Sequence, residues 1–229
     1  MAKSRRAHLS EAQEDYLKQV LLLSEGGPVV TQALAERMGV RPASVTGMLK
    51  KLAALGLVNY APYRGVTLTE AGRAVALEVL RHHRLIETYL AEALGYEWDE
   101  VHAEAERLEH HISEAFEARI AEWLGHPERD PHGDPIPAAD LALPPGGGRA
   151  LRDCPPGHYR LLRVRTQDRG TLSLLARLGL VPGARLALLQ QEDAGVRVEL
   201  AAGSFLLPAE LAAALDAESV QTEEVLHGG

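Results

Sequence analysis

Two short helical patterns, joined through a glycine and followed by a hairpin pattern, constrain the fold of this chain most strongly. Residues 31–40 and 41–56 each repeat apolar side chains at helical spacing, and Gly39 marks the end of the first pattern. Residues 57–72 then alternate apolar and polar side chains around a Pro–Gly turn, which predicts a β-hairpin. A further helix is expected within residues 10–27. This order is typical of a winged helix-turn-helix.

In a winged helix-turn-helix, the second helix of the pair lies in the major groove and its first residues meet the base edges. Arg41 can present its guanidinium fork to guanine, and the lysines one turn further on suit phosphate. The candidate DNA contacts are Arg41, Pro42, Ser44, Thr46, Lys50, Lys51, Tyr63 and Arg64. A winged helix used only for protein contacts remains the alternative.

The net charge of −8 is divided unevenly along the chain. Residues 1–75 hold 10 Lys and Arg against 6 Asp and Glu, and so carry +4. Residues 76–144 hold 5 against 16 and carry −11, and residues 145–229 hold 9 against 10 and carry −1. A basic first third beside an acidic middle third indicates two partners of opposite charge, such as DNA and a metal cation. Ordinary solvated surfaces that happen to segregate would give the same division.

The acidic middle third is also rich in histidine, with seven of the ten histidines of the chain. Its periodicity predicts two longer helices, at 71–95 and 103–125. His83 and Glu87 are four residues apart and share a face of the first helix.

Glu106, Glu109 and His110 are predicted to share a face of the second helix with His102. The two glutamates repel each other there, so either the face is only solvated or positive charge lies on it. Carboxylates and imidazoles on facing helices build metal sites, and Glu-x-x-His is one such pairing. The pattern therefore favours a metal site.

Proline and glycine dominate residues 126–150, which predicts a loop followed by a linker. Beyond it, short strand patterns lie at 158–165, 185–191, 196–201 and 204–208, which favour a five-strand barrel of SH3-like type. The chain is expected to be mainly α with β. The expected domains are a winged-helix DNA-binding domain (1–75), a helical dimerisation and metal-binding domain (76–144) and an SH3-like β-barrel (145–229).

Composition excludes several classes of protein. No run of about 18 apolar residues is present, so no transmembrane helix is predicted. The basic start MAKSRRAHLSEAQ is followed by no apolar segment and is not a secretory signal. The single cysteine, Cys154, rules out an intramolecular disulfide framework and fits a reducing cytoplasm.

Several longer motifs carry a family resemblance. They are EDYL (14–17), RPASVTGMLKKL, GLVNYAPYRGVTLTEAG, RHHRLIETYL, VHAEAERLEHHIS and HGDPIP (132–137). In this order the chain resembles the diphtheria toxin repressor family of metal-dependent transcriptional regulators, most closely its manganese-responsive members. The resemblance covers most of residues 11–137, and the last domain resembles the SH3-like module of the family more weakly.

The resemblance implies a primary, regulatory metal site made of Asp15, Glu106, Glu109 and His110. Iron-responsive relatives carry Met and Cys where this chain has Asp15 and Glu106. Because carboxylates are hard oxygen ligands, the expected metal is Mn²⁺, with Fe²⁺ possible.

The resemblance also implies an ancillary site at His83, Glu87 and His102. Asp130 and His132 fall in a loop that supplies ligands in some three-domain relatives, and Asp168 is a candidate donor from the last domain. Lys18 stands where two-domain manganese regulators carry a glutamate. An ammonium cannot ligate, so the closely spaced two-metal cluster of those proteins is not expected.

One ion shared by Asp15 and the middle third would tie the two domains together, whereas repulsion among the carboxylates should leave them free without metal. We therefore expect a homodimer that binds a palindromic operator in double-stranded DNA and represses metal-uptake genes when metal is abundant. Two alternatives are a winged-helix regulator that responds to an organic ligand and a carboxylate-bridged di-metal enzyme. The enzyme would need two Glu-x-x-His helices, and the only comparable group that the sequence offers is Glu106, Glu109 and His110.

Overall fold

The computed structural model describes residues 8–24, 27–201 and 203–220. The chain divides into two compact units, each with its own core. The first unit comprises Met1–His83, Glu109–Ile112 and Pro137–Leu143; the second comprises Arg84–Leu108, Ser113–Ile136 and Pro144–Gly229. Within the described ranges, no helix is both long and apolar enough to cross a membrane.

The first unit contains three helices, a hairpin and the start of a long helix. The elements are α2 (Glu11–Leu23), α3 (Thr31–Met38), α4 (Pro42–Ala54), β1 (Val58–Ala61), β2 (Gly65–Leu68) and the first part of α5 (Glu70–Leu94). The apolar faces of α2, α3, α4 and α5 bury one core with the hairpin. The predicted winged helix-turn-helix is confirmed.

Local sequence signals place these elements. Gly39 ends α3 in the left-handed conformation, at φ 63°, which costs glycine little. Pro42 opens α4 at a position where its missing N–H is harmless. A Cβ on Gly72 would lie 1.9 Å from the carbonyl oxygen of Leu57, so only glycine lets α5 start so close to the hairpin. These constraints leave the outer face of α4 exposed beside the hairpin.

The helical part of the second unit contains the rest of α5, α6 (Val101–Leu108) and α7 (Glu114–Trp123). The predicted single helix over 103–125 is wrong, because α6 ends at Leu108 and α7 begins at Glu114. Ser113 starts the new helix, since its Oγ accepts a hydrogen bond from the backbone N–H of Phe116 at 3.3 Å. Glu109 therefore lies beyond the end of α6.

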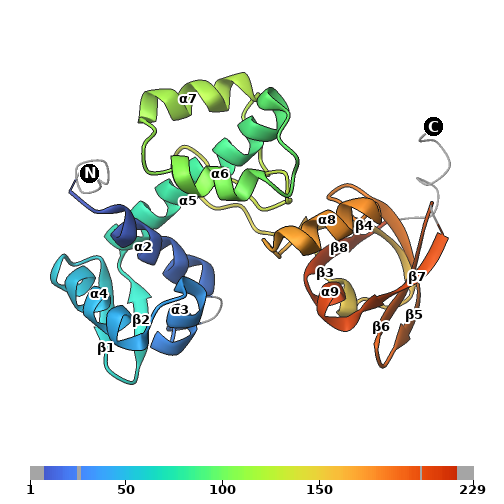
Figure 1. The fold of residues 1–229 in the computed structure, drawn as a ribbon, viewed down its shortest axis with the longest axis horizontal. Helices are drawn as coiled ribbons and strands as arrows, with labels where there is room; N and C mark the ends of the chain where they lie inside the picture. Colours follow the sequence, from blue (N-terminus) through green and yellow to red (C-terminus); the bar gives the residue numbers. More distant parts are fainter. Residues whose placement is uncertain (1–7, 25–26, 202, 221–229) are drawn as a thin grey trace. The chain divides into compact units, whose positions relative to one another are not determined.

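The C-terminal part of the second unit is one antiparallel sheet in the order β3-β8-β4-β5-β6-β7 (Figure 1). Its elements are β3 (Arg149–Ala150), the 3₁₀ turn η1 (Leu151–Asp153), β4 (Gly157–Val164), α8 (Arg169–Arg177), β5 (Arg185–Glu192), β6 (Gly195–Leu200), β7 (Gly203–Pro208), α9 (Ala209–Ala213) and β8 (Leu215–Ser219). The SH3-like type is confirmed, but the expected number of strands is wrong. Sequence patterning missed β8 because Asp216, Ala217 and Glu218 are residue types that are uncommon in strands.

The loop before the linker is fixed to this sheet. The backbone N–H of Val164, on β4, donates to the carbonyl oxygen of His132 at 2.8 Å. Gly133 has φ 85°, and a Cβ there would lie 1.9 Å from the carbonyl oxygen of Leu162. Arg163 reaches Asp134 with an N–O distance of 3.3 Å. The position of the loop therefore depends on the β domain.

Candidate metal centres and nucleic-acid interface

The first candidate metal centre lies in the first unit and consists of Asp15, Glu109 and His110. Each residue offers one ligand atom, and these atoms lie within 4.8 Å of one another. Nε2 of His110 is 2.9 Å from Oδ1 of Asp15 and 3.2 Å from Oε1 of Glu109. Glu109 is fully buried, whereas the side chain of Asp15 is 30% exposed. Two carboxylates and one imidazole thus converge, with an approach from solvent past Asp15.

His110 is polarised by carboxylates on both ring nitrogens. Its Nδ1 is 2.7 Å from Oε2 of Glu14, a buried residue of α2. Burial lowers the pKa of His110, but hydrogen bonds to Asp15 and Glu14 outweigh this and raise the pKa to about 9. The metal-free imidazole is therefore cationic at neutral pH. Since a ligating imidazole must be neutral, a metal bound by His110 would have to displace that proton.

The buried carboxylate of Glu109 joins the residues around it. Its Oε1 accepts a hydrogen bond from Nζ of Lys18 at 2.6 Å, and its Oε2 lies 2.5 Å from Nδ1 of His83. Its backbone carbonyl oxygen lies 3.1 Å from Nδ1 of His82. A buried carboxylate needs such partners, because desolvation without them is costly.

The predicted primary set is thus only partly assembled in the first unit. Asp15, Glu109 and His110 come together there, whereas Glu106 belongs to the second unit, where it is 3.8 Å from Nε2 of His102. Sequence reasoning missed Glu14. It lies three residues before Leu17 on the buried face of α2, and an acid on an apolar stripe signals a buried partner.

The second candidate centre lies in the second unit and consists of Glu87, on α5, with Asp130 and His132 from the loop. All three side chains are at most 1% exposed. Nε2 of His132 donates to the carbonyl oxygen of Trp98 at 2.8 Å, which leaves the lone pair on Nδ1. That Nδ1 is buried, has no hydrogen-bond partner and lies 3.8 Å from Oε2 of Glu87. A buried nitrogen lone pair that faces carboxylates fits a metal ligand whose tautomer is fixed by its other nitrogen.

The charges of this centre are poorly balanced. Burial, together with the charges of Glu87 and Asp134, raises the pKa of Asp130 to about 8, although Arg84 partly offsets them. Burial lowers the pKa of His132, but Glu87 and Asp130 outweigh it and the net pKa is raised. Oδ1 of Asp130 accepts hydrogen bonds at 2.9 Å from the backbone N–H groups of His132 and Asp134. The loop is thus shaped around a carboxyl group that requires a proton or a cation.

The remaining predicted ligands are distributed as follows. His102 contacts Glu87, with Nδ1 3.0 Å from Oε1, whereas His83 belongs to the first unit and contacts Glu109. Asp168 is not among the grouped side chains within the described ranges. It is exposed and caps α8, accepting hydrogen bonds from the N–H and hydroxyl of Thr171 at 2.8 Å. These bonds lower the pKa of Asp168. The sequence reading did not predict α8 and so missed this capping role.

The donor chemistry of both centres is the same, with two carboxylates and one imidazole in each. Hard oxygen and borderline nitrogen donors suit Mn²⁺ and Fe²⁺. Neither group contains a thiolate. Cys154 packs in the core of the β domain, and burial raises the pKa of its thiol.

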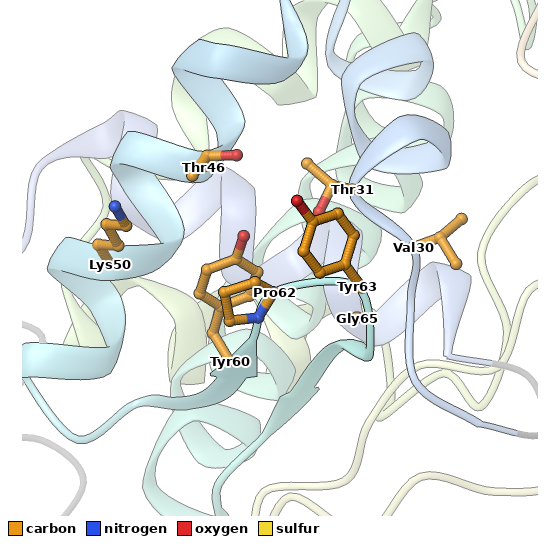
Figure 2. Close-up of a pocket in the computed structure, with 8 residues that line it drawn as sticks. All are labelled: Val30, Thr31, Thr46, Lys50, Tyr60, Pro62, Tyr63 and Gly65. Atoms are coloured by element: carbon orange, nitrogen blue, oxygen red, sulfur yellow. The ribbon is translucent and has the colours of Figure 1, made fainter.

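The candidate DNA-binding residues form one exposed surface of the first unit. Arg41, Pro42, Ser44, Lys50, Lys51, Tyr63 and Arg64 are exposed and Thr46 is half-buried. A hollow of about 430 Å³ lies between α4 and the hairpin. Figure 2 shows Thr46 and Lys50 on α4 facing Tyr60 and Tyr63 of the hairpin across this hollow. An ammonium with several hydroxyl groups suits a phosphate of the DNA backbone.

Three family models match consecutive parts of the chain. They are the iron dependent repressor N-terminal DNA binding domain (residues 8–66), the iron dependent repressor metal binding and dimerisation domain (69–138) and the FeoA domain (149–218).

Whole-chain relatives agree with these models. The iron-dependent repressor IdeR of Mycobacterium tuberculosis is 34% identical over 227 residues, which cover 93% of this chain and 99% of the relative. The diphtheria toxin repressor of Corynebacterium efficiens is 34% identical over 199 residues, 80% of this chain and 85% of the relative. A solved manganese-dependent transcriptional repressor in complex with manganese has a TM-score of 0.84 and 41% identity, and the match covers 91% of this chain and 100% of that one. The chain therefore belongs to the diphtheria toxin repressor family of metal-dependent transcriptional repressors.

Proposed function

We propose that the protein is a DNA-binding transcriptional repressor that is activated by Mn²⁺, with Fe²⁺ as a second activator. It acts as a cytoplasmic homodimer on a palindromic operator and represses metal-uptake genes when metal is abundant. The proposed domains are 1–75 for DNA binding, 76–144 for dimerisation and metal binding, and 145–229 for the SH3-like module.

The convergence of Asp15, Glu109 and His110 is the observation that carries this proposal. Asp15 lies on α2, which packs in the core of the winged helix, whereas Glu109 and His110 follow the end of α6. An ion held by all three residues would join α2 to that segment and stabilise the arrangement in which they meet. A divalent cation supplies the positive charge that draws the carboxylates together.

The proposed roles differ between the residues of the first centre. Asp15 and Glu109 provide oxygen ligands and His110 a nitrogen ligand, while Glu14 orients the imidazole through its other nitrogen. Glu106 is proposed as a further ligand on the basis of the family resemblance. The preference for Mn²⁺ rests on the carboxylates and on the manganese-dependent relative.

The second centre is proposed to hold a second ion through Glu87, Asp130 and His132. His102 supports Glu87, and the contacts of the loop with β4 hold His132 in place. Such an ion would stabilise the packing of the loop against the β domain.

The two other function classes make different predictions. A regulator of the same fold that responds to an organic ligand would keep its response after His110→Ala. A di-metal enzyme would need both carboxylate-rich helices to face one pocket. The relatives are transcriptional repressors, which favours a regulator over an enzyme.

Fluorescence anisotropy with DNA from the promoter of its own gene tests the proposal. Metal-stripped protein should bind weakly, and Mn²⁺ or, without oxygen, Fe²⁺ should raise its affinity by about tenfold or more. His110→Ala should abolish the rise. His111→Ala, which changes an exposed neighbour, should retain it. Equal binding with and without metal would refute metal activation.

A further inference from the structure

Lys18 contacts Glu109 in the first candidate metal centre, where an ammonium is unexpected. Lys18 is 1% exposed, and its side chain is among the largest that are fully buried within the described ranges. It comes from the same helix as Glu14 and Asp15, one turn after them. Lysine is rarely buried unless it is paired, so the position requires an explanation.

The ammonium is directed at a proposed metal ligand. Nζ of Lys18 donates to Oε1 of Glu109 at 2.6 Å, and the same Oε1 lies 3.2 Å from Nε2 of His110. Both side chains of the ion pair are at most 2% exposed. The oxygen that a metal would share with His110 is thus already held by a positive charge.

The ion pair has opposite consequences for the metal-free and metal-bound protein. Without metal, it compensates a buried carboxylate that would otherwise be strongly destabilising. With metal, the ammonium remains within a few ångströms of a divalent cation, in surroundings that screen charge poorly. The same side chain therefore stabilises the metal-free protein and opposes metal binding.

We propose that Lys18 is a resident cation of the first metal centre that competes with the metal for Glu109 and so sets the metal concentration at which the repressor responds. This inference rests on the proposed function in so far as Asp15, Glu109 and His110 bind the activating metal. Lys18 itself is a positioning and affinity-setting residue and does not ligate.

A purely structural lysine would behave differently. Its removal would loosen the cluster, so both the stability of the metal-free protein and its affinity for metal would fall. A resident cation predicts opposite signs, because its removal lowers the stability of the metal-free protein but tightens metal binding. The sign of the change in affinity separates the two roles.

The experiment compares Lys18→Met and Lys18→Gln with the wild-type full chain. Mn²⁺ affinity and stoichiometry are measured on metal-stripped protein by isothermal titration calorimetry, and the melting temperature is measured without metal. Both variants should bind Mn²⁺ at the first centre at least about tenfold more tightly and melt at lower temperature without metal. Lys18→Arg keeps the positive charge, so its affinity for Mn²⁺ should equal that of the wild type.

Arg37→Met is the matched control, because it removes an exposed cation on α3 that donates to Gln19 rather than to the cluster. It should leave Mn²⁺ affinity unchanged. Lys18→Gln can still donate a hydrogen bond to Glu109, so it keeps the test measurable if Lys18→Met does not fold without metal. Unchanged or weakened Mn²⁺ binding in Lys18→Gln would overturn the inference.

His110→Ala separates failure of this inference from failure of the proposed function. If His110→Ala binds Mn²⁺ at both centres as the wild type does, the proposed first centre is wrong. If His110→Ala loses one ion and the Lys18 variants do not tighten binding, the centre stands and only the role of Lys18 is wrong.

Discussion

The two candidate metal centres use the same donors but differ in the charges that the chain itself provides. In the first centre, Lys18 and His83 contact the carboxylate of Glu109, and His110 is cationic when no metal is bound. In the second centre, Nδ1 of His132 is buried without a hydrogen-bond partner, and the pKa of Asp130 is raised to about 8.

This difference suggests different tasks for the two centres. The first is electrostatically compensated without metal, and Asp15 is partly exposed, so a metal can exchange with the resident cations. The second is closed, and Arg84 compensates its carboxylates only in part, so an ion there would be retained and would stabilise the loop. We therefore assign sensing to the first centre and structural support to the second.

Removal of one imidazole from each centre should give the largest and most distinct effects. His110→Ala should weaken Mn²⁺ binding at the first centre by about 100-fold or more and abolish metal-stimulated DNA binding. His132→Ala should keep that stimulation but lose part of the rise in melting temperature caused by Mn²⁺. DNA-binding anisotropy and differential scanning calorimetry measure the two responses. Equal loss of DNA binding in both variants would contradict the division of tasks.

Gly133→Ala tests whether the loop of the second centre depends on the β domain. Its Cβ would meet the carbonyl oxygen of Leu162 at a φ of 85°, so we expect a loss of about 2–5 kcal/mol in the free energy of unfolding. Gly95→Ala is the matched control, since Gly95 has φ 70° but nothing within 4 Å of a Cβ. It should cost about 1–2 kcal/mol. Urea denaturation measures both, and equal losses would show that the loop is not constrained by β4.

Asp216 makes the stability of the region around the same loop depend on pH. Burial raises the pKa of Asp216, but the hydrogen bonds from Arg165 and Arg163 outweigh it, and the net pKa is lowered. Arg163 also contacts Asp134 in the loop. Since the pKa of Asp216 in the folded protein lies below the ordinary aspartate value of 3.8, this stabilisation is present above that pH and is lost as pH falls below it.

Asp216→Asn should therefore lower the free energy of unfolding by about 2 kcal/mol at neutral pH. The difference from the wild type should shrink as pH falls below the ordinary aspartate pKa of 3.8. Urea denaturation across pH checks this. Asp153→Asn, in an exposed pair with Arg152, should change stability by less than about 1 kcal/mol. A loss with Asp216→Asn that is the same at all pH values would exclude the charge as the cause.

The fluorescence emission of Trp98 should show whether Mn²⁺ occupies the second centre. This is the smallest of the expected effects. Its ring centroid lies 5.3 Å from that of His132, whereas Trp123 packs edge-on against Tyr89 at 5.6 Å. Binding of paramagnetic Mn²⁺ should partly quench the emission of Trp98. Trp98→Phe should remove the quenching and Trp123→Phe should preserve it. Quenching that persists in Trp98→Phe would place the ion elsewhere.

The order of elements in the first unit was predictable because each signal is local. Gly39 ends a helix, Pro42 starts the next, and the hairpin alternates around its turn. The break after Leu108 was not predicted, because the residues on either side continue a helical pattern and only the cap at Ser113 marks the new start. Strand β8 was not predicted either. Its residue Asp216 is buried because Arg163 and Arg165, from another part of the chain, donate hydrogen bonds to it.

The candidate site was predictable as a set of residues but not as an arrangement. Residue type and the family resemblance identified Asp15, Glu109 and His110. The partners of those residues, Glu14 and Lys18, emerge only when α2 and the segment after α6 pack together. Asp168 shows the reverse case, because a carboxylate of the right type is used to cap a helix.

The most direct test of the account is anomalous X-ray diffraction near the manganese absorption edge, on crystals of the full chain grown with Mn²⁺. We expect an anomalous peak bounded by Asp15, Glu109 and His110, at about 2.0–2.3 Å from their ligand atoms. A crystal with Mn²⁺ at Glu87, Asp130 and His132 but none at the first centre, under conditions in which Mn²⁺ activates DNA binding, would contradict it.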